Sequence, residues 1–227
     1  MEYGSTIGKK FYEDGSVRRY PGNTVVADIL PGCPAYDVMS QLRQWVIDAG
    51  LDDHFILLPE DSYHMTLFRG LNDQVRNATF WPEALPLDAP MTQVDDHVSA
   101  AVEKAGLPGP ARMKFDRVAT TKNCMIIRLV PADEEQNRIL RQFRDRGAEN
   151  VGVFFPKHEN YVFHISLAYT RIVPEGEAAQ RLADLEAKIN AYIADQPAFY
   201  TAQPFMAFYH NMHHFSPTRV SRDYDEL

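Results

Sequence analysis

The chain has 227 residues, a hydrophobic fraction of 45% and a formal net charge of −8. This length and composition predict one compact, bilobed unit with a real hydrophobic core. An acidic surface repels polyanions, so we expect no broad binding to duplex nucleic acid, although a short anionic ligand can still bind in a locally basic cleft. No apolar run is long enough to span a bilayer, and the polar first segment lacks the apolar stretch of a secretory leader. We therefore expect a cytoplasmic protein that does not enter membranes, with Cys33 and Cys124 as reduced thiols.

The first half of the chain predicts two strands and two helices. The β-branched segment TVVADIL favours a strand, and apolar residues at helical spacing, ended by Gly50, favour a helix. The predicted order is a polar arm (1–21), a strand (24–30), a helix (35–49), a strand (63–69), a long loop (70–90) and a helix (92–105).

The second half predicts a similar alternation, with two amphipathic helices that each carry an apolar stripe. The predicted order is two strands (113–120 and 124–130), a helix (133–146), a strand (161–169), a helix (175–194), one or two strands within 198–209, and a polar tail (217–227).

The order of elements contains an internal repeat. A strand, a proline, a helix and a strand bearing the pattern H-x-[ST] occur twice, and the matching positions are Pro31 and Pro131, His64 and His164, Thr66 and Ser166, and Leu67 and Leu167. We therefore predict an α+β fold of two pseudo-symmetric lobes in a single domain over 1–227. Each lobe is expected to be a mainly antiparallel sheet with outer helices, and the lobes are expected to enclose a central cleft.

The pattern H-x-[ST] occurs four times, beginning at His64, His97, His164 and His214. Such a short pattern arises readily by chance in a chain with eight histidines, so its context must decide. His97 lies in a predicted helix, and His214 lies in a polar segment that ends at a proline. Only the motifs at His64 and His164 lie in apolar strands and at matching places in the repeat.

Residues two apart in a strand point to the same side. His64 and Thr66 therefore share one face of their strand, and His164 and Ser166 share one face of theirs, each opposite an apolar face. A surface pair without function remains an alternative for either motif alone. The duplication favours a functional site.

Two imidazoles with neighbouring hydroxyls suit the cleavage of a phosphodiester. That reaction needs a base for the nucleophile and an acid for the leaving oxygen, and histidine can serve as either near neutral pH. The hydroxyls can donate hydrogen bonds to the non-bridging oxygens.

Paired H-x-[ST] strands in a duplicated α+β chain resemble the 2H phosphoesterase superfamily, which includes 2′,3′-cyclic nucleotide phosphodiesterases and LigT-type RNA ligase-like proteins. The segments GNTVVADI, YHMTLFRG and FYHNMHHFSP are similar to its DUF1868 branch. The resemblance implies that His64 and His164 are the general acid and base, without assigning which is which. It also implies that Thr66 and Ser166 bind phosphate and that no metal or other cofactor is needed. Ser166 replaces the usual threonine and keeps the donor.

Further candidates for the site lie near the ends of predicted strands or in the long loop. Arg69, Lys122, Arg171 and Tyr209 can contact a phosphate, and Trp81 can stack on a base, although a solvated side chain or a core position is the alternative for each. Strand parity places Tyr169 on the apolar face, in the core.

Two other functions stay open. A non-hydrolytic protein can bind nucleotides or RNA ends in the same cleft. A metal-dependent hydrolase can use His210, His213 and His214, with Asp223 and Asp225 nearby. For the main hypothesis, the expected partner is a small phosphorylated, nucleotide-like substrate or an RNA terminus, with no membrane and no duplex nucleic acid.

Overall fold

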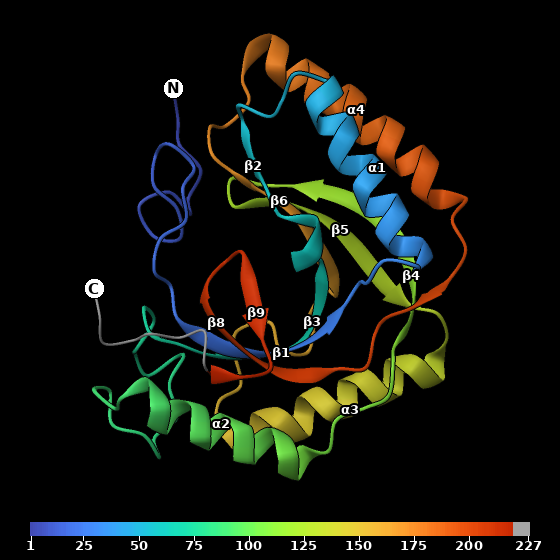
Figure 1. Ribbon diagram of the computed structural model, residues 1–227. Coiled ribbons are helices and arrows are strands. Elements are labelled where there is room, and N and C mark those ends of the chain that lie inside the picture. The colour runs from blue at the N-terminus through green and yellow to red at the C-terminus, as the bar shows by residue number, and fades with distance from the viewer. Residues whose placement is uncertain (220–227) are drawn as a thin grey trace.

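The computed structural model describes residues 1–219, and in that range it has four α-helices and one curled, nine-stranded antiparallel sheet (Figure 1). The helices are α1 (Pro34–Asp48), α2 (Met91–Ala105), α3 (Glu134–Val151) and α4 (Gly176–Ala194). The strands are β1 (Gly22–Asp28), β2 (Phe55–Leu57), β3 (His64–Asn72), β4 (Arg112–Thr120), β5 (Cys124–Pro131), β6 (His164–Thr170), β7 (Phe199–Tyr200), β8 (Phe205–Asn211) and β9 (His214–Ser216).

The mixed α+β class is confirmed, as are the predicted helices and main strands. α3 extends further than predicted, because the chain stays helical until Gly152, which ends it with a φ of 85°. β2 and β9 were not predicted. Both have only three residues, which is too short to show an alternating pattern, and β9 lies in a polar segment.

The sheet has an internal symmetry. Its strand order is β7-β4-β5-β6-β3-β1-β8-β9, with β2 added to β6. β3 and β6 lie at the centre, β1 and β5 flank them, and β8 and β4 come next. The central strands are joined through the pair Met65 and Ile165, which hold matching places in the two halves. The predicted two-fold relation is therefore built around one residue pair, and the two halves share a single sheet.

Helices cover the outer face of the sheet in two pairs, α1 with α4 and α2 with α3 (Figure 1). Each pair combines one helix from each half of the chain. Met65 and Ile165 are fully buried in the core between the sheet and the helices. The polar side chains of the central strands lie on the opposite, curled inner face of the sheet.

The N-terminal arm, residues 1–21, is attached to the sheet and lies beside its open side (Figure 1). Tyr3 bridges to Ile172, just beyond β6, and Phe11 is fully buried in a second apolar cluster with Met212. A Cβ on Gly4 would lie only 1.9 Å from the carbonyl oxygen of Thr170, so the close approach of the arm to β6 requires glycine at this position.

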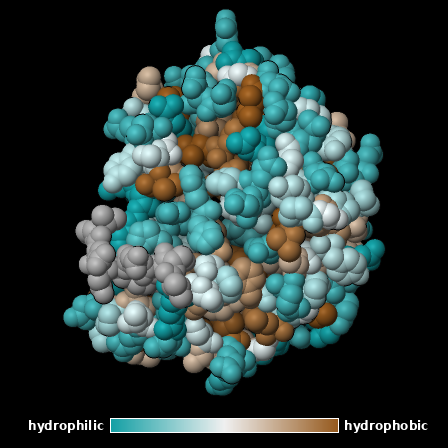
Figure 2. All heavy atoms as spheres, viewed as in Figure 1, coloured by the Kyte–Doolittle hydropathy of each residue, from teal (hydrophilic) through white to brown (hydrophobic). Residues whose placement is uncertain are grey.

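Hydrophilic side chains cover most of the face shown in Figure 2, and they separate its hydrophobic areas. This matches a chain with 31 acidic and 23 basic residues. Within residues 1–219, no helix has both the length and the apolar character that crossing a membrane requires.

Candidate active site

The two predicted histidine motifs meet on the inner face of the sheet. Met65 pairs with Ile165 in antiparallel register, and both point into the core. Because side chains alternate along a strand, their neighbours project to the opposite side. The side chains that line one common cavity of about 480 Å³ there include His64, Thr66, His164 and Ser166.

Each central strand contains the same irregularity directly after its motif. In the pairing of β3 with β1, Leu67 is an extra residue between Thr66 and Phe68, and Leu167 is the extra residue of β6 in its pairing with β5. A bulge of this kind shifts the alternation by one residue. Residues three positions after each hydroxyl therefore return to the inner face.

Arg69 and Tyr169 are the residues that the bulges turn into the cavity. The prediction that Tyr169 lies in the core is wrong, because strict parity takes no account of the extra residue in β6. Arg69 lines the cavity as predicted, and its guanidinium carbon lies 5.1 Å from the ring centre of Phe80 and 4.9 Å from that of Phe155.

The two imidazoles are held in the same way. Nδ1 of His64 lies 2.7 Å from the carbonyl oxygen of Ser62, and Nδ1 of His164 lies 2.8 Å from that of Val162. A carbonyl oxygen only accepts, so each Nδ1 carries a proton and donates it. In the neutral rings, Nε2 is then the nitrogen with a free lone pair.

Burial lowers the pKa of both histidines. It lowers the pKa of His64 to about 4; the hydrogen bond to Ser62 opposes this shift, and the neighbouring His164 adds to it. For His164 burial is again the main cause, and the positive charge of Lys10 also lowers its pKa. The ring of Phe215 from β9 lies 4.3 Å from the His64 ring and contributes to its burial. Both imidazoles are therefore neutral at neutral pH before an anion binds.

A buried arginine braces the bulge in β3. Nη1 of Arg144 donates to the carbonyl oxygen of Leu67 at 2.8 Å, and its guanidinium lies 3.7 Å from the ring centre of Tyr161. The hydroxyl of Tyr161 donates in turn to the carbonyl oxygen of Thr66 at 3.2 Å. Both contacts hold the backbone segment that carries Thr66 and Arg69.

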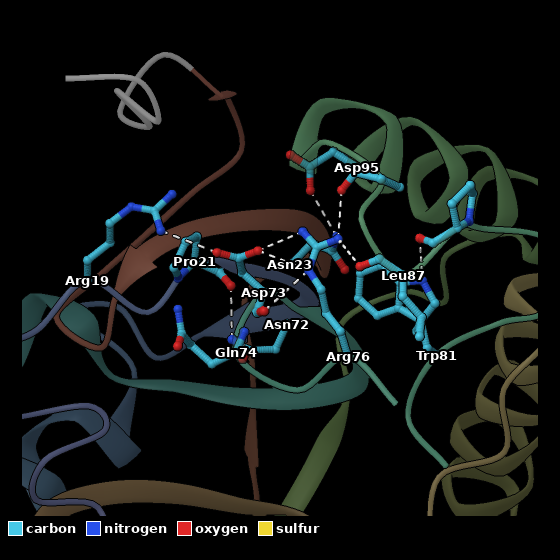
Figure 3. Close-up of polar contacts among 12 residues, drawn as sticks. Arg19, Pro21, Asn23, Asn72, Asp73, Gln74, Arg76, Trp81, Leu87 and Asp95 are labelled. Atoms are coloured by element: carbon cyan, nitrogen blue, oxygen red, sulfur yellow. Dashed lines mark hydrogen bonds and ion pairs between the residues drawn. The ribbon is translucent and has the colours of Figure 1, made fainter. Parts of the chain in front are cut away.

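Tyr209 lines the cavity, as predicted, and is held by amide side chains behind it. Nδ2 of Asn72 donates to the Tyr209 hydroxyl oxygen at 3.4 Å and to the carbonyl oxygen of Pro21 at 2.9 Å. Asn23 donates to the buried carboxylate of Asp95 at 2.9 Å, and Figure 3 shows how Asn23 and Asn72 connect the end of the arm to the sheet and α2. No described residue accepts the proton of Tyr209, so the hydroxyl can donate it to a ligand.

The same close-up shows how the loop after β3 is fastened (Figure 3). The carboxylate of Asp73 bridges Arg19, at 3.2 Å, and Arg76, at 2.6 Å. Arg76 also donates to the carbonyl oxygens of Leu87 and Ala89 at 2.9 and 2.7 Å. One ion-pair network therefore joins the arm to the long loop.

Three of the secondary candidates lie outside the cavity. Trp81 is only 4% exposed and donates to the carbonyl oxygen of Pro86 at 3.0 Å, so its ring belongs to the core and is closed to a base. Lys122 forms an ion pair with Glu2 of the arm. Arg171 donates to the carbonyl oxygen of Glu13 at 2.8 Å, which also anchors the arm.

The cavity residues that were not predicted include Lys10, Tyr20 and Asn123. Nζ of Lys10 lies 3.3 Å from the hydroxyl of Tyr169 and packs on the rings of Tyr169 and Tyr20. Nothing in the polar sequence of the arm marks Lys10 or Tyr20. Asn123 follows Asn23 at the spacing of the repeat, and both line the cavity, so that spacing was a usable signal.

The histidine and serine side chains of the other two H-x-[ST] matches do not line the cavity. Nε2 of His97 on α2 lies 2.9 Å from the carbonyl oxygen of Val151, and His214 is exposed at the start of β9. Their context in the sequence separated them correctly from the two strand motifs.

The histidines of the metal hypothesis do not gather. Within residues 1–219, no group of three or more His, Cys, Asp or Glu side chains is placed to hold a metal ion. His213 packs 5.9 Å from the Phe11 ring, whereas His214 is exposed and His210 belongs to β8. Asp223 and Asp225 lie outside the described residues.

The curled antiparallel sheet carries paired histidine and hydroxyl side chains on its inner face, as expected for a phosphoesterase of the two-histidine type. The family model described as 2H phosphodiesterase, domain of unknown function (DUF1868), matches residues 10–124. The chain belongs to this family. The matched part contains Lys10 and the His64 motif and ends before the His164 motif.

A solved structure of a conserved protein of unknown function from Agrobacterium tumefaciens str. C58 is similar over nearly the whole chain. The two sequences are 26% identical, the match covers 95% of this chain and 91% of that protein's chain, and the TM-score is 0.84. A protein from Thermus thermophilus is 13% identical, with a TM-score of 0.42 over 82% of this chain and 85% of its own. A comparison with curated proteins finds no match.

Proposed function

We propose that the chain is a metal-independent phosphoesterase that hydrolyses a cyclic or related phosphodiester of a nucleotide-like small molecule or an RNA end. One observation carries this proposal. His64 and His164, each with Nδ1 held by a backbone carbonyl, line one cavity together with the hydroxyls of Thr66 and Ser166. General acid–base catalysis of phosphodiester hydrolysis needs such a pair.

His64 is the general base in this proposal. Its pKa of about 4 keeps it neutral at neutral pH, and Nε2 then has the lone pair that accepts a proton from water. As the water oxygen attacks phosphorus, the bond from phosphorus to the ribose oxygen breaks. His164, protonated once the phosphodiester anion lies beside it, gives its proton to that leaving oxygen.

Donors around the two histidines stabilise the charge on the phosphoryl oxygens. Thr66, Ser166 and Tyr209 supply hydroxyl donors in the cavity, and Arg69 supplies a positive charge. Within residues 1–219, Arg69 forms no ion pair, so its charge is available to an anion. This local charge lets a short phosphorylated ligand bind although the whole chain is acidic.

The proposal is tested with 2′,3′-cyclic nucleotides and short RNAs that end in a cyclic phosphate, with product formation followed by phosphorus NMR or chromatography. His64→Ala and His164→Ala should each lower kcat by ~10²- to 10⁴-fold. His214→Ala is the matched control, because it changes an exposed histidine of the same short pattern.

Three outcomes would contradict the proposal. Loss of activity with a chelator would support the metal-dependent alternative. Tight nucleotide binding without turnover on any cyclic phosphate would support the non-hydrolytic binder. Equal activity of the wild type and both cavity variants would exclude the two histidines as catalytic residues.

A further inference from the structure

A second cavity lies under the N-terminal arm and continues from the first. Its volume is about 330 Å³, and it shares six residues with the cavity of the two motifs, namely Lys10, Tyr20, Asn123, His164, Ser166 and Tyr169. Residues found only in the second cavity are Ser5, Thr6, Lys9 and Cys124. The ligand space is therefore longer than a single phosphodiester requires, and it extends on the His164 side.

The charge of this second cavity is positive. Lys9 and Lys10 line it, and none of its lining residues is acidic. Neither lysine forms an ion pair with any residue in the range 1–219. Two lysines without a carboxylate partner in an acidic protein favour an anionic ligand at this place.

Thr6 provides an independent indication. Its side chain lines the second cavity and is only 7% exposed, and its hydroxyl finds no hydrogen-bond partner among the described residues. Buried polar atoms without partners are rare, because the lost hydration is not replaced. The hydroxyl oxygen is buried as it stands, so rotation of the Thr6 side chain toward an anion in the cavity would supply the missing acceptor.

The two halves of the sheet differ in charge beside this second cavity. Arg69 and Tyr169 hold matching positions after the two bulges, so the second half lacks the arginine of the first. Lys10 packs on Tyr169, with Nζ 4.9 Å from the ring centre. The arm thus brings a positive charge to the half of the cavity whose own strand supplies none.

We infer that the cavity under the arm is an anion subsite for a second phosphate of the substrate, separate from the phosphodiester that is cleaved. This inference rests on the proposed function and narrows its substrate class to nucleotides that carry an additional phosphate. Lys9 and Thr6 contact that second phosphate, and Lys10 stands between the two positions.

Two matched substrates test the inference, namely adenosine 2′,3′-cyclic phosphate and the same molecule with a 5′-phosphate. For the wild type, kcat/KM should be about tenfold or more higher with the 5′-phosphate, because a charge-assisted contact is added. The ratio of the two kcat/KM values should fall toward one in Lys9→Met and in the near-isosteric Thr6→Val. Lys114→Met, which changes an exposed lysine of β4, should keep the wild-type ratio.

A ratio near one in the wild type, or one that neither substitution changes, would overturn the inference while leaving the proposed function intact. If neither substrate is turned over, the proposed function fails, and the subsite is judged by calorimetric binding of inorganic pyrophosphate. Binding that weakens in Lys9→Met and Thr6→Val would support the subsite. Absence of binding, or equal binding by all variants, would overturn it.

Discussion

The depressed pKa of His64 predicts a specific loss of stability in acid. Burial lowers this pKa from the ordinary 6.5 to about 4. The unfolded chain therefore binds a proton at His64 more tightly than the folded one, and stability falls as the pH drops through this window. From the two pKa values, lowering the pH from 7 to 5 costs ~2 kcal/mol through His64 alone, rising to ~3 kcal/mol below pH 4.

The assay compares denaturant unfolding of the wild type and His64→Gln at pH 7 and pH 5, with the m-value checked for constancy. Gln takes up no proton, so the variant should lose ~2 kcal/mol less than the wild type between the two pH values. His214→Gln, at an exposed position, should behave like the wild type. If His64→Gln and the wild type lose the same unfolding free energy between pH 7 and pH 5, the idea that His64 is buried in its neutral form is refuted.

Three further predictions concern the parts that support the site. Gly4→Val should detach the arm, because its Cβ would meet the Thr170 carbonyl; limited proteolysis should then cut within residues 1–21, whereas Gly109→Val, at a position with open space around it, should stay resistant. Trp81→Phe should lower the free energy of unfolding by ~1 kcal/mol, because the hydrogen bond to Pro86 is lost, and should leave KM unchanged. A raised KM would instead indicate that Trp81 contacts the substrate. Arg144→Met should cost ~2 kcal/mol and lower kcat/KM, because the braced bulge positions Arg69; unchanged kinetics would contradict that role.

The sequence predicted the main helices and strands because their apolar spacing reports directly which side of an element is buried. It also predicted the pairing of the two motifs. Their equal spacing from the prolines of the repeat reflects the real symmetry around Met65 and Ile165. These features are local, or they recur at a fixed interval, so one chain is enough to find them.

The bulges and the arm could not be predicted in the same way. A bulge depends on how a strand pairs with its neighbour, and the alternation within YVFHISLAY shows no sign of the extra residue, which is why Tyr169 was assigned to the core. Lys10 lies 154 positions before His164 in the sequence, and only the docking of Phe11 and Gly4 brings it to the cavity. For Trp81 the sequence left a core position and a stacking surface open, because an indole suits both, and the structure shows the core position.

The asymmetry added by the arm bears on the roles of the two histidines. The motifs are equivalent in hydrogen bonding, so the sheet alone gives no reason for one to be the acid. The surroundings of the two rings differ, because burial lowers the pKa of His64 to about 4, whereas His164 has burial and the charge of Lys10 acting on its pKa. In the proposed reaction, Lys10 attracts an anion whose negative charge favours the protonated form of His164. In the proposed reaction, His64 is therefore the base, because its strongly lowered pKa keeps it neutral, and His164 is the acid on the side of the proposed second phosphate.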